Sequence, residues 1–224
     1  MNRTKILSAL ACFLLSVALL ATVIDGCCFD QGFYAWEYAK NYTSDVTGMS
    51  QEDNLRATVA LLDYLRGTRG DIVVHAKVND TEREVFNERE TLHMVDVRAL
   101  YQKALLARNI AAVLGIAILV FLTFYEKKKL REVLKTGFVP GVSALLALVV
   151  FVAVWAIADF DQFWTNFHLL LFDNDLWLLD PRTSIMINLF PATFFFDLVI
   201  RIILIFLFLM IAASFFIFQP WRRS

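Results

Sequence analysis

The sequence contains three histidines, and two of them have surroundings that suit acid–base chemistry. His93 lies in a segment with helical periodicity, where Glu90 and Asp96 fall on the same side of the helix. A carboxylate one turn away can fix the tautomer of an imidazole and raise its basicity. His168 lies in a segment crowded with aromatic residues, whereas His75 is expected to be an ordinary residue of a strand. Two imidazoles that meet where water is excluded can act as a base and an acid; the alternative is two unrelated histidines at a membrane surface.

Other catalytic and metal-binding patterns are missing from the sequence. Glu90-x-x-His93 is half of a di-iron signature, but it has no second copy. There is no His-Glu-x-x-His motif, no Cys/His cluster with zinc spacing, no Gly-x-Ser-x-Gly and no glycine-rich phosphate loop. We therefore expect no metal and no cofactor, and a metalloprotease, a serine hydrolase or a nucleotide-driven pump is not supported.

The composition is that of a membrane protein. Of the 224 residues 58% are hydrophobic and only 19% are charged, with 21 phenylalanines. A soluble domain of this size could not bury so much apolar surface. The formal net charge of −1 argues against nucleic-acid binding, which needs a basic face.

Four apolar stretches can each cross the hydrocarbon core, which takes about 20 helical residues. They predict a membrane all-α protein with transmembrane helices over residues 1–24, 108–125, 136–158 and 192–219. The N-terminal stretch ends in Ile24-Asp25-Gly26-Cys27, which loosely resembles a lipobox. A retained helix is favoured over a cleaved signal peptide because Asp25 stands where that motif needs a small or apolar residue.

The basic residues predict the orientation. Lys and Arg gather at the N-terminus, in the loop 126–135 and in the tail 220–224. Such enrichment marks the cytoplasmic side, so both termini are predicted to be cytoplasmic. Residues 25–107 and 159–191 are then extracytoplasmic, which makes a multi-pass protein of the cell membrane with its active site at the extracytoplasmic surface.

The two outer segments differ in character. Residues 25–107 predict a small α/β cap, with a helix that begins after Ser50, strands at Asp71–Val78 and Thr81–Phe86, and a second helix from near Asn87. Residues 159–191 predict an amphipathic segment that lies in the interface and lines a pocket. An aromatic belt at the headgroup level is the alternative for any single ring.

Two pieces of the chain form recognisable motifs. The first runs from Arg89 to Arg98 and contains His93-Met94-Val95-Asp96-Val97. The second runs from Phe167 to Pro191 and contains Asp175-Leu176-Trp177 and Asp180-Pro181. Together they resemble the lipoprotein intramolecular transacylase family of Gram-positive bacteria. The predicted span number, orientation and cap position also fit, so the resemblance covers nearly the whole chain.

The resemblance implies a reaction on a diacylated lipoprotein in the outer leaflet of the membrane. The sn-2 acyl chain moves to the α-amino group of the lipoprotein's own N-terminal Cys, which gives an N-acyl lyso-form. His93 and His168 match the family's catalytic pair, and we favour His168 as the base. No covalent acyl-enzyme is expected because one substrate carries both the ester and the amine.

Further residues are expected to support this reaction. Glu90, Asp96 and Asp175 are the supporting carboxylates, and Arg98 and Arg182 are expected to contact substrate carbonyls. Five rings are expected to pack the acyl chains and exclude water. These are Phe163, Trp164, Phe167, Phe172 and Trp177.

Two other functions stay open at the level of the sequence. One is a membrane hydrolase or protease that uses the same histidines with water. The other is a non-enzymatic membrane sensor or assembly protein whose cap binds a partner. Membrane lipid is an expected partner in each case, and the sequence predicts no particular oligomeric state.

Overall fold

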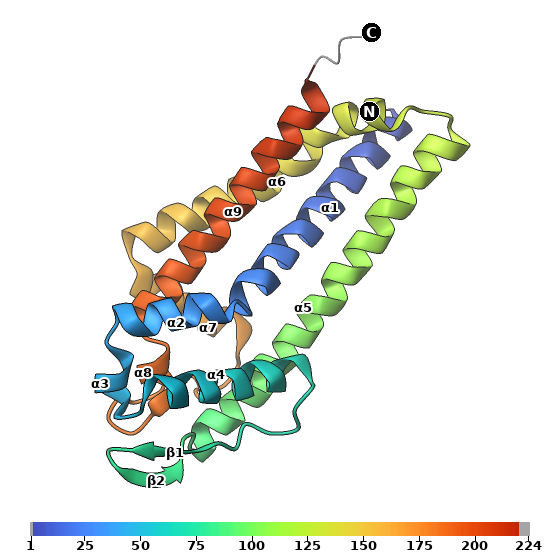
Figure 1. Cartoon of the computed structure of the whole chain (residues 1–224). Coiled ribbons are helices and arrows are strands. Elements are labelled where there is room, and N and C mark those ends of the chain that lie inside the picture. The colour runs from blue at the N-terminus through green and yellow to red at the C-terminus, as the bar shows by residue number, and fades with distance from the viewer. Residues whose placement is uncertain (1, 220–224) are drawn as a thin grey trace. The chain divides into compact units, whose positions relative to one another are not determined.

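The computed structural model describes residues 2–219, which form two compact units (Figure 1). The first unit comprises the described residues up to Asp25, Ala104–Ile157 and those from Val199 onward. The second unit comprises Gly26–Lys103 and Ala158–Leu198. The predicted cap and the predicted aromatic segment therefore belong to one unit rather than to two separate ones.

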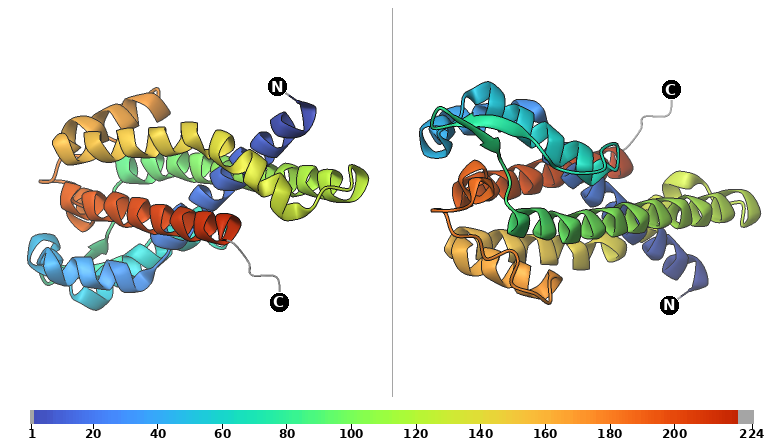
Figure 2. Two further views of the ribbon diagram at one scale, coloured as in Figure 1. Left: turned by 90° about the horizontal axis from the view of Figure 1, so that it is seen from above. Right: turned by 90° about the horizontal axis from the view of Figure 1, so that it is seen from below.

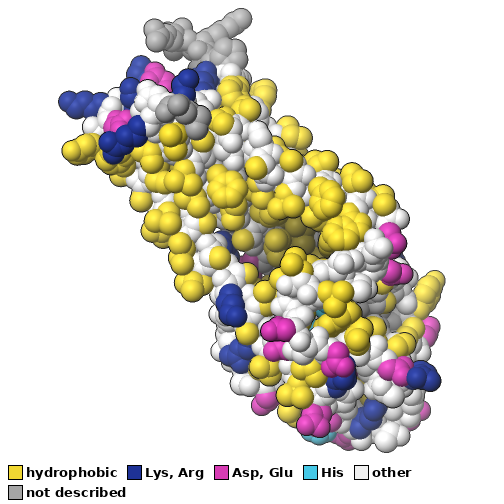
Figure 3. Space-filling model, turned by 180° about the vertical axis from the view of Figure 1, so that it is seen from behind, with side chains coloured by type: hydrophobic (Ala, Val, Ile, Leu, Met, Phe, Trp, Pro, Cys, Tyr) yellow, Lys and Arg dark blue, Asp and Glu magenta, His cyan; other side chains and the backbone are white. Residues whose placement is uncertain are grey.

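Four helices of the described chain are long and apolar enough to cross a membrane. They are α1 (Arg3–Cys28), α5 (Glu88–Val120) with its π-helical extension η1 (Phe121–Tyr125), α6 (Leu130–Ala158) and α9 (Ala192–Phe218). Each predicted span falls on one of these helices, which confirms the predicted fold class. On the face seen in Figure 3, hydrophobic side chains cover the long helices, as contact with lipid requires. The predicted cytoplasmic tail, 220–224, lies outside the described residues.

The first unit has a core built by three of these helices. Figure 2 shows α6 and α9 running alongside each other. The buried core side chains come from α1, α6 and α9, and they are Cys12, Val142, Leu145, Val149, Ile203, Phe206 and Met210.

Two glycines of α6 allow a close approach to α1. A Cβ atom at Gly137 would lie 2.2 Å from the backbone oxygen of Ser8, and one at Gly141 would lie 2.3 Å from that of Ala9. The Gly-x-x-x-Gly spacing places both glycines on one face of α6, where small residues let two membrane helices touch through their backbones. No larger side chain fits this contact unless the helices move apart.

The second unit holds the remaining elements. They are α2 (Gln31–Lys40), α3 (Thr43–Thr47), α4 (Gln51–Arg66), β1 (His75–Val78), β2 (Thr81–Glu84), α7 (Phe160–Leu171) and α8 (Ile185–Leu189), together with the start of α5 and of α9. The strands pair antiparallel, with Val78 opposite Thr81. Asn79 and Asp80 have φ of 50° and 62°, the left-handed pair that a two-residue hairpin turn needs.

Local signals in the sequence located part of this unit. The side chain of Ser50 accepts a hydrogen bond from the backbone N–H of Asp53, so it caps α4 as predicted. Gly67, whose φ is 83°, follows the last residue of α4 as its C-cap. The helices α2 and α3 were not predicted. The segment lacks an apolar stripe because its buried face includes Glu37 and Thr47.

The buried face of α4 is not the face that its hydrophobic residues alone would indicate. Asn54 and Thr58 are buried, whereas Leu55 and Val59 are only partly buried. The hydroxyl of Thr47 donates to Oδ1 of Asn54 at 3.0 Å, and Thr58 donates to the Asn54 carbonyl. Polar side chains satisfied in this way can occupy the core, so the buried face is rotated by about one residue.

The contact between α1 and α6 generates a stability prediction. We expect Gly137→Ala to lower the free energy of unfolding by about 1–3 kcal/mol because the added methyl group overpacks the contact with Ser8. This cost exceeds the gain in helix propensity, which is at most about 1 kcal/mol. The thermal unfolding midpoint in detergent measures the change.

Gly26→Ala is the matched control, because no heavy atom lies within 4 Å of a Cβ placed there. A midpoint for Gly137→Ala equal to or above that of the unmodified protein would contradict the packing described for α1 and α6.

Candidate functional site

Two helices of the second unit bring the two predicted histidines together. His93 lies near the start of α5 and His168 near the end of α7. Their ring centroids are 6.2 Å apart, and the rings are inclined by 35°. His93 is 8% exposed and His168 7% exposed. The structure thus places the two imidazoles in one buried site, although they are far apart in the sequence.

α5 and α7 begin at defined capping residues. The side chain of Asn87 accepts a hydrogen bond from the backbone N–H of Glu90 at 3.0 Å, and Glu90 accepts one from the N–H of Asn87 at 2.6 Å. This reciprocal pair is a capping box and sets the start of α5. Asp159 caps α7 by accepting from the N–H of Gln162 at 2.9 Å. Each histidine therefore sits on a helix whose first turn is fixed.

A backbone contact determines the tautomer of His168. Its Nδ1 lies 2.8 Å from the carbonyl oxygen of Trp164, one turn earlier in α7. A carbonyl can only accept, so Nδ1 carries the proton and Nε2 of the neutral ring presents a lone pair. This orientation leaves Nε2 as the basic atom of the site.

The ring of His93 is held differently. Among the described residues, its buried Nδ1 has no hydrogen-bond partner. Leaving a buried polar atom unpaired costs about 1–3 kcal/mol, so a ligand atom that pairs with it gains that contribution. This unpaired polar atom lies beside a second imidazole and can pair with a polar group of a ligand.

Burial favours the neutral form of both imidazoles. His93 belongs to the charged first part of α5, before the apolar stretch that follows Arg108, and burial lowers its pKa to about 4. His168 lowers the pKa of His93 further, Asp96 opposes the shift, and Arg89 adds to it. Burial also lowers the pKa of His168 below its ordinary value, and the hydrogen bond to Trp164 partly opposes this.

The predicted role of Glu90 as a partner of His93 is not what the structure shows. Glu90 is fully buried, and its Oε1 accepts from the hydroxyl of Ser184 at 2.5 Å and from the N–H of Met186 at 2.7 Å. Together with the bond from Asn87, these contacts join the start of α5 to α8. The sequence indicated the right helical face, but the carboxylate satisfies backbone and hydroxyl donors instead of an imidazole.

The other two predicted carboxylates attach the segment after α7 to α5. Oδ2 of Asp96 accepts a hydrogen bond from Nδ2 of Asn174 at 2.9 Å. Oδ1 of Asp175 lies 3.2 Å from the guanidinium of Arg89, which also donates to the Asp175 carbonyl. Asn174, Arg89 and Ser184 were not predicted as site residues. The only sequence signal for these three residues was that they lie close to predicted site residues along the chain.

Aromatic rings surround the histidine pair. Phe172 lies 5.3 Å from the ring of His93 and 5.8 Å from that of His168. Trp177 stacks on His168 at 4.8 Å, and Trp164 meets it edge-on at 4.7 Å. Phe167 also contacts His168, at 5.6 Å.

The predicted ring Phe163 is one contact further from the pair. It is buried and lies 6.4 Å from Phe167. Four of the five predicted rings thus contact a catalytic candidate directly, and the fifth packs behind them.

The two predicted arginines make other contacts. The guanidinium of Arg98 lies over the ring of Tyr64 in α4, 4.5 Å from its centroid. Arg182 is exposed and pairs with Asp180, which lowers the pKa of that carboxyl. The structure does not bring either arginine to the histidines.

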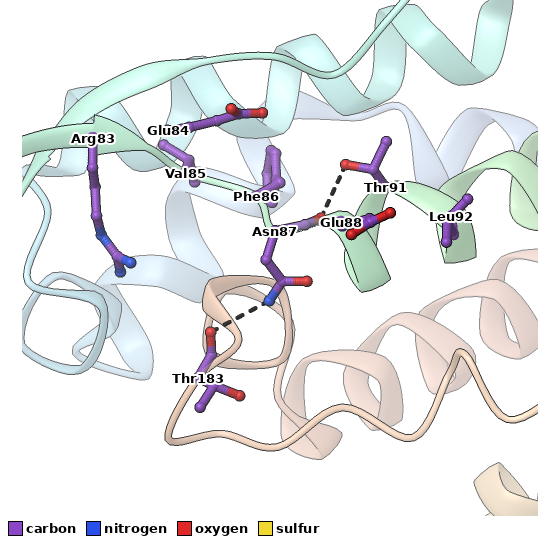
Figure 4. Close-up of a pocket in the computed structure, with 9 residues that line it drawn as sticks. All are labelled: Arg83, Glu84, Val85, Phe86, Asn87, Glu88, Thr91, Leu92 and Thr183. Carbon is purple, nitrogen blue, oxygen red and sulfur yellow. Dashed lines mark hydrogen bonds between the residues drawn. The ribbon is translucent and has the colours of Figure 1, made fainter.

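A pocket of about 440 Å³ opens beside the start of α5 (Figure 4). The side chain of Asn87 points toward the backbone of Thr183, and its Nδ2 donates to the Thr183 carbonyl at 3.4 Å. Thr91 and Leu92 line it, and they directly precede His93. Neither histidine is among its described lining residues, so this pocket adjoins the site but does not contain it.

Comparison with known protein families shows the family of the chain. The sequence model of the family described as lipoprotein intramolecular transacylase Lit matches residues 9–195. The chain belongs to the lipoprotein intramolecular transacylase family. It is therefore an acyltransferase that acts on lipoproteins, and the predicted family and enzyme class are confirmed. Family membership does not favour the hydrolase or the non-enzymatic alternative.

Solved structures of a family member share the fold. The membrane-integral lipoprotein intramolecular transacylase Lit from Bacillus cereus matches with a TM-score of 0.80 at 17% identity, over 99% of this chain and 98% of that chain. Two further structures of that protein, in which a histidine is replaced by arginine or by alanine, match with TM-scores of 0.75 at 18% identity. They cover 96% of this chain and 90% and 91% of theirs. A comparison with curated proteins finds no match. The family fold and the four apolar helices make this transacylase a multi-pass membrane protein.

The buried site predicts the titration of His168. Because burial disfavours the imidazolium, we expect the ring to take up its second proton only below about pH 6.5, the ordinary value for histidine. Above that pH Nε2 stays unprotonated. ¹⁵N resonances of labelled histidine rings in detergent give the midpoint, and His168→Gln assigns the signal. A midpoint at or above the ordinary value would show that the ring is not buried as described.

Proposed function

We propose that the chain transfers the sn-2 acyl chain of a diacylglyceryl lipoprotein to the α-amino group of that lipoprotein's own N-terminal cysteine. His93 and His168 are the catalytic pair of this proposal. It rests on one observation above all, the two buried imidazoles with ring centroids 6.2 Å apart. A hydrogen bond spans about 2.6–3.2 Å, so one tetrahedral centre between the rings can reach both.

The tautomers support a division of roles. Nε2 of His168 is free to accept a proton because Nδ1 donates to the Trp164 carbonyl. We therefore propose His168 as the base for the α-ammonium of the cysteine. His93 has an unpaired Nδ1 and is neutral at pH 7, so it acts as a hydrogen-bond donor to the oxyanion or to the departing glyceryl oxygen.

The proton count of the reaction fits two neutral imidazoles. The ammonium first loses a proton to His168, and the free amine attacks the ester carbonyl. A second proton leaves the nitrogen as the amide forms, and the glyceryl alkoxide takes up one proton. The net products are the amide, the alcohol and one released proton, so each ring can return to its neutral form.

The proposed reaction needs no acyl-enzyme. The ester and the amine belong to one bound molecule, and holding them in reacting geometry can contribute roughly 7–11 kcal/mol. The supporting residues Asp96 and Asp175 act through the segment that carries Phe172 and Trp177. The aromatic rings around the pair are the proposed walls for the acyl chains. Arg98 and Arg182 have no place in this proposal, since their contacts lie elsewhere.

We place the reaction at the extracytoplasmic surface. Lys and Arg residues gather at the N-terminus and between α5 and α6, which is typical of the cytoplasmic side. Residues 25–107 and 159–191, which hold both histidines, then face outward. The diacylated lipoprotein reaches the site from the surrounding membrane lipid.

Alanine replacement of either histidine tests this function. We expect His93→Ala and His168→Ala each to lower the rate of N-acylation by about 10²–10⁴-fold, the usual contribution of a positioned acid or base. The substrate is a diacylglyceryl-cysteinyl lipopeptide in detergent, and mass spectrometry of its fragments locates the acyl chain.

His75→Ala is the control, because His75 is exposed on β1 and lies outside the proposed site. Folded His93→Ala and His168→Ala proteins that N-acylate the lipopeptide as fast as His75→Ala would rule out the proposed pair.

A further inference from the structure

A short irregular segment after α7 covers the histidine pair. Phe172 contacts both imidazoles, and Trp177 stacks on His168. We call these two side chains the aromatic cover. No helix or strand includes either of them, so something other than regular secondary structure must keep the cover in place.

Two polar contacts hold this segment against α5. Arg89 precedes His93 by one helical turn and binds Asp175, through both its carboxylate and its carbonyl. Asp96 follows His93 by one turn and accepts from Asn174 at 2.9 Å. Consecutive residues of the segment are thus attached to α5 on either side of His93.

Asn174 also orders the segment from within. Its Oδ1 accepts from the N–H of Leu176 at 3.0 Å, and its backbone carbonyl accepts from Nε1 of Trp177 at 3.0 Å. The same residue therefore binds α5 and shapes the turn that aims the indole at His168.

We propose that Arg89, Asp96 and Asn174 are positioning residues that hold the aromatic cover over the imidazole pair and so keep water away from the ester. This inference rests on the proposed function of His93 and His168. The three residues act through the cover and do not touch the reacting atoms.

The chemistry makes this exclusion matter. The same base that deprotonates an ammonium can deprotonate water, whose oxygen then attacks the same ester carbonyl. That reaction consumes one water and gives a free fatty acid and a lyso-lipoprotein with an unmodified amine. Transacylation conserves the mass of the lipoprotein, whereas hydrolysis removes one acyl chain. The choice between the two products depends on whether water reaches the site.

The exposure of the contacts permits the cover to open. The side chains of Arg89 and Asp175 are 41% and 74% exposed, and such ion pairs contribute little to stability. Because both imidazoles are buried, a lipid headgroup can reach them only if some covering residues move. The segment with exposed polar attachments is the one that moves at the lowest cost.

The test is the product ratio of the double variant Arg89→Met with Asn174→Ala, measured on the full-length protein with a diacylglyceryl lipopeptide. Loosening the cover is expected to lower kcat for N-acylation by roughly 10-fold, within the 10²-fold that a misplacement of about 1 Å can cost. The share of lipopeptide that loses one acyl chain is expected to rise several-fold, while KM changes less than kcat.

Matched controls exist in the same unit. Arg69→Met removes an arginine of similar exposure, 40%, whose ion pair with Asp71 lies in another loop. Asn166→Ala removes an exposed asparagine of α7 that donates to its own helix. Both controls are expected to keep the kcat and the product ratio of the unmodified protein.

A reciprocal exchange separates positioning from unfolding. Asn174→Asp alone sets two carboxylates against each other, and Asp96→Asn together with Asn174→Asp restores a donor–acceptor pair with its direction reversed. We expect Asn174→Asp to hydrolyse the ester of the lipopeptide. We expect the double exchange to recover most of the N-acylation.

Two results would overturn the inference. One is an Arg89→Met, Asn174→Ala protein with the kcat and product ratio of the controls, and the other is an exchange variant no better than Asn174→Asp. If His93→Ala and His168→Ala keep their activity, the proposed function fails as well. If His93→Ala and His168→Ala are inactive but the Arg89→Met, Asn174→Ala protein behaves like the controls, the proposed histidine roles are retained. Only the positioning role is then rejected.

Discussion

Two neutral imidazoles share one buried, aromatic-walled space, and the rest of the site follows from this constraint. A buried imidazolium would lose most of its hydration, so burial shifts both rings towards the neutral form. A neutral ring has one donor and one acceptor nitrogen, and the Trp164 carbonyl fixes which is which in His168. In the proposed mechanism, His168 then acts as the base and His93 as the hydrogen-bond donor.

The carboxylates near the site bind groups other than the imidazoles. Glu90 is fully buried one turn from His93, yet its oxygens accept from a hydroxyl and from backbone N–H groups. These hydrogen bonds fix the side chain at the start of α5 and join it to α8. Asp96 is bound to Asn174. These carboxylates organise the polypeptide around the rings and make no described hydrogen bond to them.

The sequence could predict features that depend on short-range pattern. Apolar length predicts the four membrane helices, Ser50 predicts the start of α4, and the Asn79-Asp80 pair predicts the hairpin turn. The histidine pair could be predicted only because two further signals pointed to one site. These were the density of aromatic residues around His168 and the resemblance to a known family. The orientation of the chain stays a prediction from its basic residues.

Other features depend on partners far along the chain, and no local pattern contains them. Glu90 was expected beside His93, but its partners Ser184 and Met186 lie in α8. In the sequence, nothing distinguishes Asn174 from other loop residues. Its hydrogen bond to Asp96 depends on the fold. Asn54 and Thr58 are buried in α4 because hydrogen bonds inside the core satisfy them, and a hydrophobic pattern alone does not reveal this.

The most direct test of the account follows one acyl chain. A lipopeptide labelled with ¹³C only in its sn-2 acyl chain is incubated with the purified protein in unlabelled lipid, and mass spectrometry locates the label. We expect the labelled chain to appear on the α-amino group of the same molecule, with no change in total mass. Labelled fatty acid in solution, or an unlabelled acyl chain on the amine, would contradict an intramolecular transfer.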